Sequence, residues 1–182
     1  MNFKNNLFAV SLAVVAVTQL YGCASPANRG AMVAPAPTTV GAGKTFPHTV
    51  SVETTGGQAT TAMDSSNVSN EDLKAAIEQS LVQSNLFKSI VEGKNGDYEL
   101  NVTVTRLNKP MFGLTFTVEM EAGWSLVRKS DGNVAMRKSI TSSHTATFSD
   151  AAAAVTRLRL AVEGAAQSNI AQGLEALAQL DL

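Results

Sequence analysis

The sequence predicts an α+β fold, a two-layer sandwich in which a mainly antiparallel sheet of about four strands carries two helices on one face. Two observations lead to this prediction. Segments of apolar–polar alternation, the period of a half-buried strand, are flanked by two segments in which apolar residues recur at helical spacing. The chain of 182 residues is also long enough for one domain with its own hydrophobic core.

Residues 1–22 have the pattern of a signal peptide. Lys4 makes a short positive region, and the run from Leu7 to Leu20 carries no charge. That run is too short for the roughly 30 Å hydrocarbon core of a membrane, which needs about 20 apolar residues in a helix. The run ends in Leu-Tyr-Gly-Cys at the chain's only cysteine, Cys23, which cannot form an internal disulfide.

This ending resembles the lipobox of bacterial lipoproteins, in which the leader is cut just before a lipidated cysteine. The resemblance implies that Cys23 carries acyl chains such as palmitate, and that these hold the protein on a membrane. In lipoproteins of this type, an Asp after the cysteine resembles a signal for retention in the inner membrane. Ala24 and Ser25 stand there instead, so the expected location is the outer membrane, facing the periplasm.

Residues 23–46 are expected to form the lipidated N-terminus and an Ala/Pro/Gly-rich linker, a flexible or partly extended tether. The linker contains Gly43-Lys44-Thr45, which resembles the end of the phosphate-binding motif G-x-x-x-x-G-K-[ST]. The motif's first glycine is replaced by Thr38, and a β-branched run follows where the motif requires a helix. We therefore expect no nucleotide at Gly43-Lys44-Thr45.

The folded periplasmic domain is expected to span residues 47–182. His48 to Thr54 has the composition of a first strand. A helix follows, because Ser69 can cap it and Asp72 stands at the position of the capping-box acid. The helix is expected to end near Asn85.

Three antiparallel strands are expected next. Tyr98 to Thr105 alternates strictly between apolar and polar residues, and Leu114 to Val127 places apolar residues at every even position. Asp131-Gly132 then predicts a hairpin turn. The return strand, from Val134 to Phe148, alternates less cleanly, which suits an edge strand or a strand with a bulge.

A long helix is expected from about Asp150 to the C-terminus. Gly164 and Gly173 each cost about 1 kcal/mol relative to Ala in a helix, so each is expected either to allow close packing on the sheet or to mark a bend. The residues expected on its buried face are Val155, Leu158, Val162, Ala165, Ile170, Leu174 and Leu177.

Candidates for catalysis are few. His144 stands near Ser142, Ser143 and Asp150, which allows a nucleophile–base–acid set on residue type alone. The sequence has neither the G-x-S-x-G elbow nor a metal-spaced His/Cys cluster. Strand parity predicts instead that His144 points to the apolar face and packs there with a hydrogen bond. It is kept as a minor catalytic candidate; no cofactor or metal is expected.

Charged and hydroxyl residues of the expected strands fit a solvated face. Glu119 and Glu121 project from the same wet face, and paired carboxylates can do acid–base work, but solvation is the preferred interpretation. The Thr-rich outward positions of all three strands could also receive a partner or an added strand. In the last helix, Arg159 can pair with Glu163 one turn on. The net charge of −1 gives no indication of nucleic-acid binding.

The stretch from Asp72 to the C-terminus, most strongly Thr147 to Ile170 (TFSDAAAAVTRLRLAVEGAAQSNI), resembles a group of small Gram-negative outer-membrane lipoproteins often labelled UDP-N-acetylglucosamine acyltransferase. The acyltransferases acting on that sugar nucleotide resemble left-handed β-helices of hexapeptide repeats, a period that this sequence lacks. The order of elements is also similar to that of lipoproteins assisting lipopolysaccharide assembly or lipid-transporting ABC systems.

These observations favour a non-enzymatic, lipid-anchored lipoprotein of the cell envelope that binds a protein or lipid partner as an assembly module. Two alternatives stay open. One is an acyl- or glycan-transferase that uses His144 as its base. The other is a periplasmic carrier of a lipid or small ligand, for which a large apolar cavity between sheet and helices would be the sign.

Overall fold

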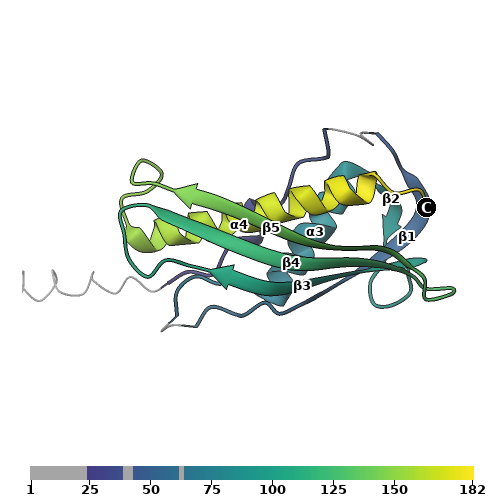
Figure 1. Ribbon diagram of the computed structural model, residues 1–182, viewed down its shortest axis with the longest axis horizontal. Helices are drawn as coiled ribbons and strands as arrows, with labels where there is room; N and C mark the ends of the chain where they lie inside the picture. The colour runs from purple at the N-terminus through teal and green to yellow at the C-terminus, as the bar shows by residue number, and fades with distance from the viewer. Residues whose placement is uncertain (1–23, 39–42, 62–63) are drawn as a thin grey trace, which may run out of the picture.

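The computed structural model describes residues 24–38, 43–61 and 64–182. The predicted signal peptide and Cys23 lie outside these residues. The chain forms the predicted α+β sandwich, and Figure 1 shows the long strands in front of the two long helices. The elements are α2 (Arg29–Met32), β1 (Phe46–Thr55), α3 (Asn70–Ser84), β2 (Phe87–Ile90), β3 (Tyr98–Asn108), β4 (Phe116–Arg128), β5 (Val134–Ala146) and α4 (Ala154–Ala178).

The sheet has five strands in the order β2-β1-β3-β4-β5, one more than predicted. Strand β1 is parallel to both of its neighbours, whereas β3, β4 and β5 form an antiparallel meander. Val50 marks the level at which β2 ends on one side of β1 and β3 begins on the other. Strand β2 escapes prediction because its four residues, from Phe87 to Ile90, are too short to show a period.

The predicted helix and strand boundaries are largely confirmed. The Ser69 hydroxyl accepts a hydrogen bond from the Asp72 N–H at 3.0 Å, which caps α3. Asn85 ends this helix in the left-handed conformation, with φ of 52°. The turn between β4 and β5 contains Gly132 with φ of 72°, and β5 lies at the edge of the sheet as expected.

Two apolar residues were predicted on the buried faces wrongly. Leu114 is 76% exposed and Val155 is 45% exposed. Leu114 precedes the first residue of β4, and Val155 lies in the first turn of α4. Both stand at the end of the sheet, outside the interface between strands and helices. The other predicted residues of α4 are buried or half-buried.

A buried polar network joins α4 to the sheet. The indole N–H of Trp124 on β4 donates to the Asn169 side-chain oxygen at 2.9 Å. The Asn169 amide donates in turn to the Ile140 carbonyl at 2.9 Å, and the Ser142 hydroxyl donates to the Ala165 carbonyl at 2.8 Å. These polar groups are therefore satisfied inside an otherwise apolar interface. Among the described residues, no helix is both long and apolar enough to cross a membrane.

The segment 24–38, expected to be an unpacked tether, is packed on the domain. Met32 and Ala34 are fully buried, and α2 contacts both α3 and α4. The Asn28 N–H donates to the Glu163 carboxylate at 2.8 Å, and the Gln167 amide donates to the Val33 carbonyl at 2.9 Å. Ala-rich composition suits a flexible tether, but small side chains also allow close packing, and here packing prevails.

Candidate functional site

One end of the domain gathers the start of the described chain and parts of three connections between elements. We call it the anchor-side end and define it as residues 24–28, 64–69, 109–115 and 147–153. The Ser66 hydroxyl donates to the Ser25 carbonyl at 2.8 Å, and the Ala27 N–H donates to the Asn67 carbonyl at 3.2 Å. The Lys109 ammonium donates to the Ser66 carbonyl at 3.0 Å and to the Asn67 side-chain oxygen.

The connection between β3 and β4 carries a cluster of exposed apolar side chains. We call Met111, Phe112 and Leu114 the apolar tip. They are 92%, 85% and 76% exposed, respectively. The segment from Pro110 to Thr115 contains no charged residue. Exposed apolar side chains are common singly, but three within four residues indicate a contact surface.

The third connection of this end, residues 147–153, is fixed to the start of α4 by Arg157. The Arg157 guanidinium donates to the Ala151 and Ala152 carbonyls at 2.8 and 2.7 Å. Its centre lies 5.5 Å from the buried Phe116 ring and 5.4 Å from the Phe148 ring, which is 62% exposed. Arg157 therefore orders the surface beside the apolar tip. The residue types alone gave no sign of this role.

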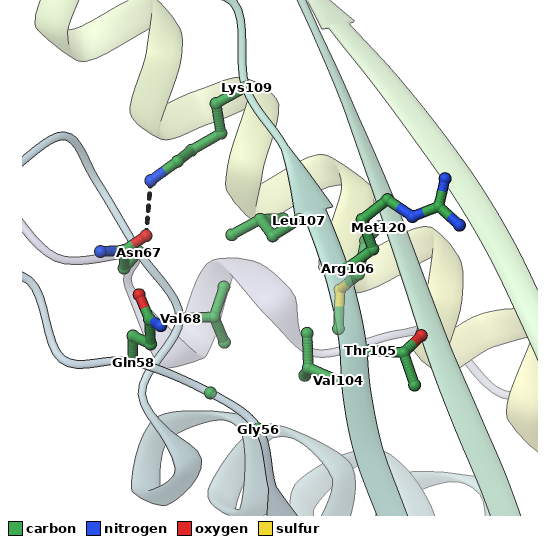
Figure 2. Close-up of a pocket in the computed structure, with 11 residues that line it drawn as sticks. Gly56, Gln58, Asn67, Val68, Val104, Thr105, Arg106, Leu107, Lys109 and Met120 are labelled. Carbon is green, nitrogen blue, oxygen red and sulfur yellow. Dashed lines mark hydrogen bonds between the residues drawn. The ribbon is translucent and has the colours of Figure 1, made fainter.

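A cavity of about 230 Å³ opens beside the anchor-side end, as Figure 2 shows. Its apolar wall comes from β3, β4 and residue 68, and its polar rim comes from the loop after β1 and from Lys109. Burial lowers the pKa of the Lys109 ammonium. The residues that line the cavity include Gln58, Asn67, Val68, Val104, Leu107, Lys109 and Met120.

Gly56 shapes the cavity because its backbone passes very close to β3. It has φ of 77°, and a Cβ at this position would stand 2.1 Å from the Val104 carbonyl oxygen. No side chain fits there. Figure 2 also shows the Arg106 guanidinium pointing away from the cavity; it forms an ion pair with Glu121 at 2.8 Å. The cationic group at the rim is therefore Lys109, already bonded to Asn67.

His144 lies on the helix-facing side of β5, as strand parity predicts, because its ring covers Gly164 of α4. It is nevertheless exposed at the sheet edge, and its ring makes no hydrogen bond with any residue that the structure describes. The expected hydrogen bond is therefore wrong. The Ser142 hydroxyl is buried and donates to the Ala165 carbonyl, whereas Ser143 points to the opposite face.

Asp150 is committed to a local turn. Its carboxylate accepts from the Thr147 N–H at 2.7 Å and from the Thr147 hydroxyl at 2.8 Å, and these bonds lower its pKa. The residues around His144 are thus not aligned as a nucleophile, base and acid. Across the described ranges, no three His, Cys, Asp or Glu side chains gather as a metal site requires.

The uncovered sheet face carries the Glu and Thr residues singled out in the sequence. Glu121 bonds Arg106 and the Ser139 hydroxyl, so it serves cross-strand pairing. Thr117 and Thr145 bond each other across β4 and β5 at 2.8 Å. Glu119 is exposed on the same face, as predicted. The arrangement fits a solvated face whose polar groups satisfy one another.

The Gly43-Lys44-Thr45 segment leads into a strand, as predicted, because β1 begins at Phe46. The Lys44 ammonium donates to the Leu180 carbonyl and pairs with Asp181 at 2.8 Å. This lysine therefore fastens the entry of β1 to the C-terminus. Cys23, the predicted lipidation site, lies outside the described residues.

No family model matches this chain, and no curated protein matches it. Among solved structures, it is similar to a Xanthomonas campestris protein of the domain family DUF330, with 16% identity and a TM-score of 0.53, over 80% of this chain and 88% of the other. That likeness shows the fold.

Two further structures are similar to this chain. A candidate lipoprotein of Caulobacter crescentus shares 18% identity with a TM-score of 0.46, over 70% of this chain and 87% of the other. A minor lipoprotein of Acinetobacter baumannii shares 12% identity with a TM-score of 0.41, over 72% of this chain and 92% of the other. Both of these neighbours are named as lipoproteins.

Proposed function

We propose that this protein is a lipid-anchored lipoprotein of the outer membrane, facing the periplasm, and that its domain is a non-enzymatic binding or assembly module. The observation that carries the proposal is the lipobox at Cys23, two residues before the point where Ser25 is bonded to the folded domain. The engaged side chains around His144 also favour binding over group transfer.

The short path from Cys23 to the domain has a consequence for how the module works. Residues 24–38 are held by Ser66, Ser80, Glu163 and Gln167, so they do not act as a long spacer. The domain would therefore stand at the surface of the membrane that holds the acyl chains. A partner would have to be another envelope component at that surface.

Anchoring is tested by comparing the wild-type protein with Cys23→Ser and, as a matched control, Ser25→Ala. We expect the wild type and Ser25→Ala to stay in the membrane after alkaline washing and to incorporate a clickable palmitate analogue. Cys23→Ser should lose both properties. Alkaline-resistant membrane binding of Cys23→Ser would refute the anchor. Density-gradient separation of the two membranes tests the assignment to the outer one.

The binding role is tested by native mass spectrometry of the full-length protein, gently extracted from its own membranes. We expect a lipid mass on the Cys23 peptide together with a stoichiometric second protein. Recovery of the protein alone, carrying a bound nucleotide, would contradict the module and favour a transferase. In that case His144→Ala would lower the activity if His144 were the base.

A small-ligand carrier is the second candidate, and the cavity is where its ligand would bind. The cavity volume of about 230 Å³ is below the roughly 300–1,000 Å³ of common ligand pockets, so any ligand would be small or only partly enclosed. Met120→Trp would fill the apolar wall, and Val82→Trp, at an exposed position of α3 outside the lining, serves as a control of the substitution. A bound small molecule in the wild type and in the control, absent from Met120→Trp, would support the carrier.

A further inference from the structure

The apolar tip has no role in the fold or in the proposed module. Its three side chains stand in a connection whose flanking strands are already complete, and they are 76–92% exposed. Apolar residues of that size normally lower the free energy of a protein by leaving water. A contact with something outside the described residues would therefore lower the free energy of these side chains.

The chain's own connectivity indicates what lies nearest. Ser25 is bonded to Ser66, and Ser66 accepts a hydrogen bond from Lys109, two residues before Met111. Two residues of extended chain span about 7 Å. Cys23 precedes Ser25 by two residues of the sequence, and Ser25 lies at the same end of the domain as the apolar tip. Figure 1 shows the C-terminus at the opposite end.

We propose that Met111, Phe112 and Leu114 insert into the lipid bilayer that holds the acyl chains of Cys23. The inference rests on the proposed lipid anchor and adds a second, non-covalent membrane contact to it. The anchor brings the tip to the bilayer, and the tip sets which way the domain faces. One acyl-bearing cysteine alone would leave the domain free to rotate about its attachment.

The composition of the segment suits the bilayer interface. Pro110 to Thr115 has no charge to desolvate, and aromatic and large apolar side chains are favoured where headgroups meet acyl chains. The Lys109 ammonium turns away from the tip toward Ser66 and Asn67. Phe148 directly follows Thr147, whose N–H donates to the Asp150 carboxylate, so it would stay at the level of the headgroups.

The orientation follows from the strands. Strand β4 runs from the anchor-side end to the turn at residues 129–133 and β5 runs back, so that turn would point into the periplasm. The cavity opens beside the same end and would face the lipid headgroups. The uncovered sheet face would then stand upright on the membrane, accessible from the side.

The test uses full-length lipidated protein in phosphatidylethanolamine–phosphatidylglycerol vesicles. Phe112→Cys introduces a labelling site for an environment-sensitive dye, because the only native cysteine, Cys23, is blocked by its lipid. The side chain is 85% exposed, so the change leaves the fold intact. Ser130→Cys, in the turn at the far end, is the matched control. An unchanged unfolding temperature checks both variants.

We expect the dye at position 112 to shift its emission to the blue and to be quenched at least threefold more by lipids with nitroxides on their acyl chains than the dye at 130. Replacing Met111 and Leu114 by Ser should reduce the quenching at 112. Val82→Ser, an apolar residue 62% exposed on α3, should not.

Equal quenching at 112 and 130 would overturn the proposal. A blue shift without nitroxide quenching, lost on dilution, would also overturn it and assign the tip to contact with a second copy. These outcomes are distinct from failure of the anchor. A Cys23 peptide without lipid refutes the anchor itself, whatever the dye reports.

Discussion

At the scale of single residues, Asn169 links the last helix to the sheet through two buried hydrogen bonds. Its side chain accepts from the Trp124 indole and donates to the Ile140 carbonyl, so one residue of α4 holds two strands. A buried donor left without a partner costs about 1–3 kcal/mol. Neither Trp124 nor Ile140 can reach water when Asn169 is shortened, because both are almost fully buried.

Asn169→Ala is therefore expected to lower the free energy of unfolding by about 2–4 kcal/mol, since two buried groups lose their partner and a cavity forms. The neighbouring Ser168→Ala, at a half-buried position, should change it by less than about 0.5 kcal/mol. Urea unfolding monitored by Trp124 fluorescence measures both. A loss below about 1 kcal/mol in Asn169→Ala would show that the network contributes little.

The two glycines of α4 are expected to differ. A Cβ at Gly173 would stand 2.5 Å from the buried Trp124 ring, whereas a Cβ at Gly164 would meet the ring of His144, which is exposed and can turn toward solvent. Gly173→Ala should destabilise by about 1–3 kcal/mol through overpacking. Gly164→Ala should cost less, offset by about 1 kcal/mol of helix propensity. Thermal unfolding of the two variants measures the difference in stability. Equal losses of stability would contradict the closer packing at Gly173.

At the scale of elements, β1 depends on contacts at its ends because it joins two separate parallel strands. The Asp97 carboxylate accepts from the Thr49 N–H at 2.8 Å and from the Thr49 hydroxyl at 2.9 Å. The Asp97 N–H donates back to the Thr49 hydroxyl. This reciprocal pair fixes β1 to the turn that leads into β3.

The Thr49 bonds lower the pKa of Asp97 below its ordinary value of 3.8. The unfolded chain therefore binds the proton more readily, so the contact stabilises the fold above pH 3.8 and is lost as the pH falls through the lower folded pKa. Asp97→Asn should be less stable than the wild type at pH 7, with the difference shrinking below pH 3.8. Urea titrations at several pH values measure it; a constant difference would contradict it.

The elements that the sequence predicted well are those with a long, one-sided pattern. The alternation of Tyr98 to Thr105 and the cap at Ser69 hold in the structure because each is a local property of the chain. Strand β2 and helix α2 were not predicted, since four residues show no period and both elements exist only through tertiary contacts. The pattern likewise could not show that Leu114 lies before the start of β4.

The functional residues also divide into those predicted from a local motif and those whose roles depend on tertiary contacts. Cys23 was predicted from a local motif, which no structural contact tests. Lys109 bonds Ser66, which is distant in the sequence, and Arg157 bonds the irregular segment just before α4 and lies over the Phe116 ring of β4. Neither contact follows a periodic pattern, so the sequence gave no signal for these roles. A sequence reading could have noticed the apolar tip, because Met111, Phe112 and Leu114 stand between two strands without a charge. The extended even-position pattern concealed it by assigning Leu114 to β4.

At the scale of the whole molecule, the packed N-terminal segment makes a prediction that separates it from a tether. Met32 is fully buried between α3 and α4, so Met32→Ala should lower the free energy of unfolding by about 2–5 kcal/mol. Ala36→Ser, at an exposed position of the same segment, should have no measurable effect. Urea unfolding compares the two, and a neutral Met32→Ala would restore the interpretation of this segment as a free tether.

The bonds from Asn28 to Glu163 and from Val33 to Gln167 also impose an order of events during biosynthesis. Each joins residues about 135 positions apart, and a ribosome delivers the first of them long before α4 exists. Closing so large a loop is slow compared with local pairing. Residues 24–38 would therefore stay accessible to processing enzymes until the last helix is made, and then become shielded. Processing of the N-terminal segment would therefore have to occur before α4 is synthesised and folds onto it.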